Sequence, residues 1–134
     1  MKISKVAEDA KLPTRKHHTD AGLDFYSLED YTILPNETKI VRTGIAIELP
    51  KDTMGLIKPK SRHHYLIGAG VVDQDYRGEI KIKIFNTAKS PIFIFKGDPA
   101  GQLVIVPILL PTLEVVPPES LQETKRGRSG GINN

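Results

Sequence analysis

Ten prolines and eleven glycines interrupt this chain of 134 residues at short intervals, so that no apolar segment between them is long. The segments are rich in isoleucine and valine, and short β-branched runs bounded by turn residues are typical of strands. No segment keeps a helical apolar period beyond about two turns. The sequence therefore predicts an all-β fold, a sandwich or a barrel of short strands.

The clearest predicted strand is 79–85, in which three isoleucines alternate with two lysines. This period of two gives one buried and one solvated face. Residues 38–50 predict two strand segments with a break at Gly44. The apolar runs 91–95 and 101–109 have the length of core strands, and turn residues join them.

One domain is predicted over residues 1–124, followed by a mobile arm at 125–134, which is polar, basic and glycine-rich. No apolar run is long enough to span a membrane, and the N-terminus has no apolar signal region, so we expect no membrane partner and a cytoplasmic or otherwise intracellular protein. The absence of cysteine excludes disulfides and thiolate metal sites. A net charge of +3 with scattered basic residues predicts no stable nucleic-acid partner.

Two segments place charged or hydroxyl side chains beside turn residues. In DAGLDFYS (20–27), Asp24 follows a glycine and could hold hydrated Mg²⁺, which needs only one or two carboxylates. The alternative is a turn aspartate that accepts backbone hydrogen bonds. In GLIKPKSRHH (55–64), Lys60, Ser61 and Arg62 suit a phosphate, with a solvated basic turn as the alternative.

The segment GAGVVDQDYRG (68–78) carries the most specific pattern. Two valines between glycines predict one arm of a hairpin whose edge amides could recognise a planar base. Asp73 would then lie at the reacting centre as a general base, and Tyr76 would offer a flat face to a sugar or a ring. The alternative is a simple turn stabilised by Asp73 and Asp75.

Two further residues are weaker candidates. Gln102 begins an apolar run and could donate its amide to a phosphate oxygen, although such glutamines are usually only solvated. Arg126 lies in the predicted arm and could close over an anion, with a tail of no function as the alternative. The adjacent histidines 17–18 and 63–64 do not predict zinc, because neighbouring side chains on a strand point to opposite faces.

In combination and order, these segments resemble the five motifs of the trimeric deoxyuridine triphosphatase (dUTPase) family. AGLDFYS is similar to the first motif, PKS to the core of the second, GAGVVDQDYRGEI to the third and KGDPAGQL to the fourth. RGRSGG (126–131) is similar to the fifth motif, and VRTGIAIELP (41–50) to the framework between motifs. The resemblance covers nearly the whole chain.

The resemblance implies a jelly-roll-like, distorted β barrel with a flexible C-terminal tail. It also implies a homotrimer with active sites at subunit interfaces. The implied reaction converts dUTP and water to dUMP and pyrophosphate, with Mg²⁺ bound to the triphosphate, and keeps uracil out of DNA.

Position by position, the resemblance implies that Asp73 orients the attacking water and that Tyr76 excludes a 2′-hydroxyl. Asp24 would reach Mg²⁺ through water, and Arg126 would come from the tail of another subunit. Backbone groups would recognise the uracil edge near five residues: Ile67, Gly70, Val71, Val72 and Lys81. Four side chains would hold phosphates: Lys60, Ser61, Arg62 and Gln102.

Two motifs depart from the family pattern. The second reads Lys60-Ser61-Arg62 where Arg-Ser-Gly is usual, and the tail has no aromatic residue. These changes leave one alternative open, a catalytically weak nucleotide-binding or regulatory protein. The related dCTP deaminases need a glutamate three residues before the asparagine that ends this strand. Lys83 stands there, ahead of Asn86, which disfavours deamination.

Overall fold

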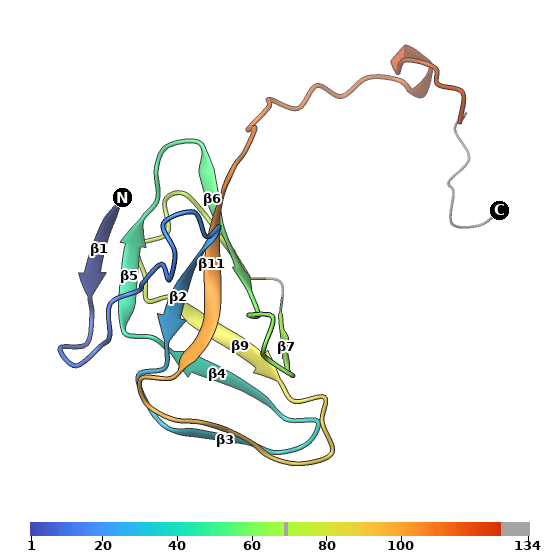
Figure 1. Ribbon diagram of the computed structural model, residues 1–134. Coiled ribbons are helices and arrows are strands. Elements are labelled where there is room, and N and C mark those ends of the chain that lie inside the picture. Colours follow the sequence, from blue (N-terminus) through green and yellow to red (C-terminus); the bar gives the residue numbers. More distant parts are fainter. Residues whose placement is uncertain (69, 127–134) are drawn as a thin grey trace.

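The computed structural model describes residues 1–68 and 70–126 and has a nearly all-β fold of short strands, as predicted (Figure 1). In chain order the elements are β1 (Lys2–Lys5), β2 (Gly22–Tyr26), β3 (Tyr31–Ile33), β4 (Thr38–Arg42), β5 (Ile45–Glu48), β6 (Thr53–Lys58), β7 (Leu66–Ile67), β8 (Gly70–Val72), β9 (Lys81–Phe85), β10 (Ile92–Ile94), β11 (Pro99–Pro107) and the 3₁₀ helix η1 (Pro118–Ser120). Within the described residues, no helix has the length and apolar character needed to cross a membrane.

The strands form four antiparallel sheets. The largest has the order β2-β11-β6-β8, a second has the order β4-β9-β7, and the pairs β1-β5 and β10-β3 complete the body. Between the described residues, these sheets do not join into one closed hydrogen-bonded barrel. The described strands therefore form an open all-β body, and the jelly-roll-like form remains what the resemblance implies.

The predicted alternation of β9 is confirmed. Ile82 and Ile84 are fully buried, whereas Lys81 and Lys83 are exposed. The isoleucines join an apolar core between the sheets that includes Phe25. Burying such side chains stabilises the body by about 2 kcal/mol each.

The predicted break at Gly44 is also confirmed, because it separates β4 from β5. Gly44 has a φ of +69°, and a Cβ atom there would lie 2.7 Å from the Cβ of Ala10. Both the backbone conformation and the close packing require glycine.

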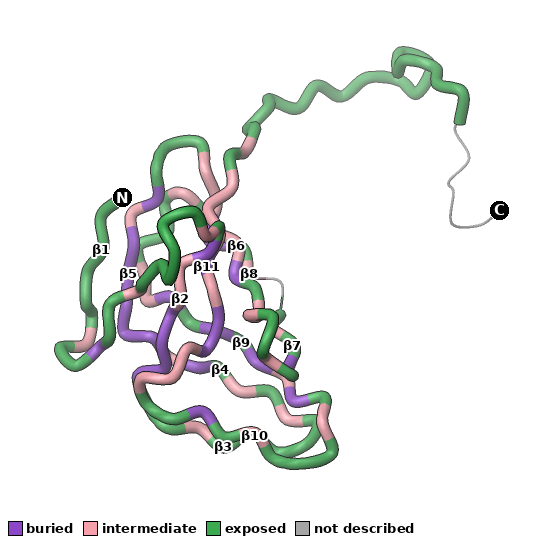
Figure 2. The backbone as a smooth tube through the Cα atoms, viewed as in Figure 1, coloured by how far each residue is buried: buried purple, intermediate pink, exposed green. Residues whose placement is uncertain are grey.

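Beyond β11 the chain leaves the body as an extended segment that carries η1 (Figures 1 and 2). Residues 109–126 are all exposed, including Leu109, Leu113 and Val115. The predicted boundary between residues 124 and 125 falls within this exposed segment and stays a prediction. The predicted arm beyond Arg126 lies outside the described residues.

Candidate functional site

Two hollows on the body contain most of the predicted site residues. The first, which we call the β8 hollow, has a volume of about 230 Å³ and is lined by Ile57, Gly70, Val71, Val72, Asp73, Tyr76, Glu79, Ile80 and Lys81. The second, which we call the cationic hollow, has a volume of about 590 Å³ and is lined by Thr14, Lys16, His17, Asp24, Tyr26, Lys60, Ser61 and Arg62. The two sets share no residue.

The β8 hollow is built on an edge strand. β8 pairs antiparallel with β6 on one side, and Gly70 lies opposite Ile57. A Cβ atom on Gly70 would lie 3.1 Å from the Ile57 Cβ, so glycine allows the two strands this close packing. Val72 is buried beneath the hollow, whereas Val71 is exposed. The outer edge of such a strand can pair with a planar hydrogen-bonding ligand.

Asp73 and Tyr76 lie on the tight turn that follows β8. The backbone N–H of Tyr76 donates to the Asp73 carbonyl at 3.1 Å, and the Tyr76 hydroxyl donates to the Glu79 carbonyl at 3.0 Å. Arg77 reinforces the turn by donating to the Gln74 carbonyl at 2.8 Å. Both Asp73 and Tyr76 are exposed. The predicted base and the predicted sugar-packing residue therefore face one hollow.

Strand pairing brings three predicted motifs together at the cationic hollow. Asp24 of β2 lies directly opposite Gln102 of β11, which in turn lies opposite Lys58 of β6. Directly opposite residues in antiparallel strands present their side chains on the same face. The carboxylate of Asp24 forms an ion pair with the ammonium of Lys60, and both side chains are largely buried.

Gln102 supports the loop before Lys60 rather than lining the hollow. Its side-chain amide donates to the Pro59 carbonyl at 3.0 Å. Its side chain lies against Gly22, where a Cβ atom would approach the Gln102 Oε1 to 2.1 Å. A role for Gln102 in phosphate binding stays a prediction.

Two other predicted residues lie outside both hollows. Ile67 on β7 is partly buried against the core, and a Cβ on Gly101 would lie 3.0 Å from its Cδ1. Arg126 is exposed on the segment that follows β11. Their predicted roles are untested by this single chain.

Sequence reasoning missed several residues that line the cationic hollow, above all Lys16 and His17. The segment that carries them is attached to β2, because Thr14 and Asp24 exchange backbone hydrogen bonds of 3.2 and 2.7 Å. The His17 N–H also donates to the Asp20 carboxylate at 2.9 Å. The signal that could have found them is the basic run immediately before the first motif.

His63, which the sequence does not predict to bind zinc, shapes the loop that carries Lys60. The Lys60 N–H donates to the Nδ1 of His63 at 3.2 Å, and the His63 N–H donates to the Lys60 carbonyl at 2.9 Å. The imidazole stacks on Tyr65 with ring centroids 4.5 Å apart. Burial, assisted by the nearby Arg62 guanidinium, lowers the pKa of His63. The neutral ring can therefore accept the Lys60 hydrogen bond at Nδ1.

Acidification is expected to destabilise the fold through His63. Its pKa is lower in the native protein than in the unfolded chain, where it is about 6.5, so the unfolded chain binds the proton more readily. The free energy of unfolding should then fall as the pH drops below about 6.5. Urea denaturation between pH 8 and pH 5 should show a shallower fall for His63→Asn than for the unmodified protein. His64→Asn, an exposed neighbour, is the matched control, and equal slopes for all three proteins would contradict the prediction.

The fold and the two hollows define an all-β, jelly-roll-like protein with charged residues gathered where its strands end. A family model described as dUTPase matches residues 8–132. The chain belongs to the dUTPase family.

Sequence relatives agree with this assignment. The mitochondrial deoxyuridine 5′-triphosphate nucleotidohydrolase of Homo sapiens is 39% identical over 134 residues, covering 97% of this chain and 52% of the human protein. The deoxyuridine 5′-triphosphate nucleotidohydrolase of Corynebacterium glutamicum is 42% identical over 137 residues, which cover 97% of this chain and 91% of the bacterial protein. The chain thus spans about half the length of the human relative and most of the bacterial one.

Solved structures agree as well. A mutant dUTPase from phage phi11 of S. aureus, described with a structural Mg(II) ion, matches with a TM-score of 0.81 at 30% identity, covering 86% of this chain and 95% of that one. A mutant dUTPase of Staphylococcus bacteriophage 80alpha, solved with dUpNHpp, matches with a TM-score of 0.84 at 28% identity. The match covers 96% of this chain and 94% of the phage chain.

Proposed function

We propose that this protein hydrolyses dUTP to dUMP and pyrophosphate and so keeps uracil out of DNA. The observation that carries the proposal is the β8 hollow, where an edge strand, Asp73 and Tyr76 meet in a chain of the dUTPase family. Deoxyuridine triphosphate nucleotidohydrolases among the relatives support the same activity. An intracellular location remains a prediction.

Each part of the β8 hollow has a distinct chemical task in this proposal. The outer edge of β8 would pair with the uracil ring, and Tyr76 would pack on the deoxyribose. Asp73 would accept a proton from the water that attacks the α-phosphorus, a task that suits an exposed carboxylate at a fixed turn. Positioning of water and substrate would supply much of the acceleration.

The cationic hollow would hold the phosphates. Lys60 and Arg62 bring positive charge, and Ser61 brings a hydroxyl donor, to one surface. Fixed cations stabilise the charge that develops during phosphoryl chemistry. A phosphate in the cationic hollow would compete with the Asp24 carboxylate for the Lys60 ammonium, because Asp24 and Lys60 already form an ion pair.

A magnesium ion fits this arrangement as an ion carried by the substrate. Among the described residues, no group of three or more His, Cys, Asp or Glu side chains could hold a metal. Mg²⁺ commonly keeps several waters and binds through one or two carboxylates together with substrate phosphates. Asp24 would hold it through water, and the ion would neutralise charge on the triphosphate.

Within one chain no described residue lines both hollows, and in a homotrimer hollows of neighbouring chains would form one site. The extended segment supports association, since Leu109, Leu113 and Val115 are 91%, 88% and 99% exposed. Apolar side chains left exposed along one segment favour burial against another chain. Arg126 would then serve the site of another subunit. Light scattering should give three times the 14.8 kDa chain mass, and a monomer would overturn this assembly.

The activity is tested by measuring pyrophosphate release with Mg²⁺ from dUTP, dCTP, dTTP and UTP in parallel. Hydrolysis confined to dUTP is the expected result. Tight dUTP binding without turnover would instead favour a nucleotide-binding protein, the alternative raised by Arg62 at the position of the usual glycine. Ammonia release from dCTP would indicate a deaminase.

Lys16 and His17 are expected to contribute to phosphate binding. Lys16→Ala and His17→Ala should each raise the KM for dUTP about three- to tenfold, because each removes a donor from the cationic hollow. The kcat should change less, since neither residue lines the β8 hollow. His18→Ala, at an exposed neighbouring position outside both hollows, is the control. An unchanged KM in both variants would remove this segment from the site.

A further inference from the structure

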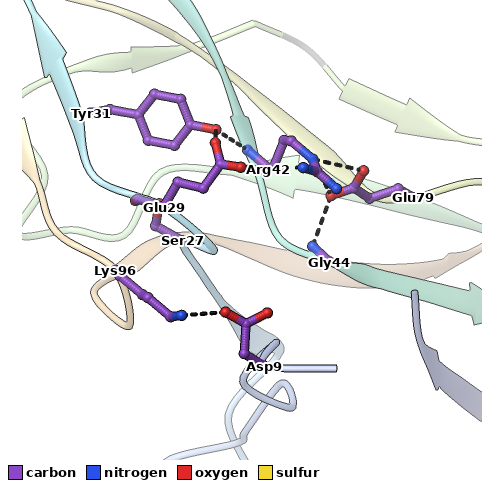
Figure 3. Close-up of polar contacts among 8 residues, drawn as sticks. All are labelled: Asp9, Ser27, Glu29, Tyr31, Arg42, Gly44, Glu79 and Lys96. Atoms are coloured by element: carbon purple, nitrogen blue, oxygen red, sulfur yellow. Dashed lines mark hydrogen bonds and ion pairs between the residues drawn. The ribbon is translucent and has the colours of Figure 1, made fainter. Parts of the chain in front are cut away.

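Glu79 lines the β8 hollow, but its carboxylate points toward Arg42 of β4 and toward Gly44 (Figure 3). It accepts the backbone N–H of Gly44 at 2.9 Å, and both of its oxygens lie 3.2 Å from the Nε of Arg42. The Glu79 side chain is only 13% exposed. Charge-assisted hydrogen bonds of this kind are about twice as strong as neutral ones.

Arg42 is itself held at both ends. Its backbone N–H donates to the Tyr31 hydroxyl at 3.0 Å, and its guanidinium donates to Glu29 at 3.2 Å (Figure 3). The Tyr31 hydroxyl donates to the same Glu29 carboxylate at 3.1 Å. Glu79 therefore meets a cation whose position is already fixed by β3, β4 and the chain between β2 and β3.

The backbone of Glu79 holds the residue on which sugar selection would depend. Its carbonyl accepts the Tyr76 hydroxyl at 3.0 Å. Tyr76 folds back over Gly78, where a Cβ atom would lie 2.5 Å from the tyrosine hydroxyl oxygen. The next residue, Ile80, donates its N–H to the Ile45 carbonyl at 2.7 Å. The Glu79 carbonyl thus holds Tyr76, and the Glu79 side chain attaches this segment to β4. The following residue, Ile80, attaches it to β5.

We propose that Glu79, clamped by Arg42 and the Gly44 amide, is the positioning residue that holds Tyr76 at the sugar and so sets discrimination between dUTP and UTP. The inference rests on the proposed function. Rejection of one additional hydroxyl requires an aromatic ring fixed within a fraction of an ångström. Tyr76 is exposed and cannot be fixed by core packing. The hydrogen bond from the Tyr76 hydroxyl to the Glu79 carbonyl fixes the ring instead. The position of the ring therefore depends on Glu79.

The test compares kcat/KM for dUTP and for UTP in Glu79→Ala, Glu79→Gln and Arg42→Met. Glu79→Ala should lower the dUTP-to-UTP ratio about tenfold, mainly through a higher KM for dUTP. Glu79→Gln keeps an acceptor for the Gly44 amide and should retain most of the discrimination. Arg42→Met removes the cation beside Glu79 but leaves the hydrogen bond from the Gly44 N–H to the Glu79 carboxylate. It serves as the second variant if Glu79→Ala fails to fold. Glu29→Gln, which removes the charge of the exposed partner of Arg42 but keeps an acceptor oxygen, should match the unmodified protein.

A double-mutant cycle separates positioning from general stability. Tyr76→Phe removes the hydroxyl anchor, so the Tyr76→Phe/Glu79→Ala double variant should lose less discrimination than the two single losses multiplied together. Losses that multiply independently, or an unchanged ratio accompanied by a lower free energy of unfolding, would overturn the proposal. Dissociation constants for dUTP and UTP report the discrimination at the binding step, without turnover. Absence of dUTP hydrolysis by the unmodified protein would therefore refute the proposed activity while leaving this inference measurable.

Discussion

Replacing Asp73 with asparagine is expected to lower the kcat for dUTP hydrolysis by about 10²- to 10⁴-fold, the usual contribution of a general base. Asparagine has nearly the same shape, but its amide cannot accept the proton of the attacking water. Asp73 is exposed at the end of β8, and its carbonyl keeps the turn hydrogen bond from Tyr76 in the variant. The free energy of unfolding should change by less than about 0.5 kcal/mol.

Asp75 provides the matched control, because it is a second exposed aspartate on the same turn but does not line the β8 hollow. Pyrophosphate release should remain close to normal in Asp75→Asn, and the KM for dUTP should change little in Asp73→Asn. An Asp73→Asn protein with a kcat within threefold of normal would exclude Asp73 as the base. Equal losses in both variants would indicate damage to the turn rather than to the chemistry.

Asn86 is expected to give the largest stability effect of a polar residue. Its side chain is fully buried at the end of β9, donates to the carbonyls of Ile33 and Ser90 at 2.9 Å each, and accepts the Ala88 N–H at 2.8 Å. Asn86→Ala removes three hydrogen bonds, of which the one to Ile33 is buried and the other two are partly buried, and a buried group left unpaired costs about 1–3 kcal/mol. The free energy of unfolding should fall by about 3 kcal/mol or more.

Urea denaturation at fixed protein concentration measures this effect, since association would make stability depend on concentration. Asn86→Asp keeps the volume but removes both donors, so it should also destabilise the fold. Thr87→Ala, at the next and exposed position, is the control and should change stability by less than about 0.5 kcal/mol. A loss below about 1 kcal/mol in Asn86→Ala would mean that solvent or neighbouring groups satisfy the freed backbone.

The strands were predictable because their signal is local. The alternation in 79–85 and the break at Gly44 depend on neighbouring residues and on the backbone freedom of glycine, and both are confirmed. The third motif was equally accessible, since its turn and its edge strand are contiguous in the chain. Gly70, Val71, Val72, Asp73, Tyr76 and Lys81 all line the β8 hollow as one segment and its return strand.

Pairing between distant strands was not predictable in the same way. The pairing of β2, β11 and β6 places Asp24 beside Lys60 and diverts Gln102 to the Pro59 carbonyl. The role of His63 depends on how the loop folds to bring its Nδ1 to the Lys60 N–H. The adjacency of His63 and His64 in the sequence does not reveal that geometry.

The sequence alone determined the fold class, the family and the candidate residues of the proposed site, because periodicity, turn residues and contiguous motifs are contained in short stretches of chain. Only the tertiary structure decided which of those residues meet. Glu79 contacts Gly44 and Arg42 across strands far apart in sequence, and the two hollows remain separate within one chain. The reason is physical: side-chain contacts depend on strand register and packing, and these are set by burial over the whole domain rather than by any local pattern.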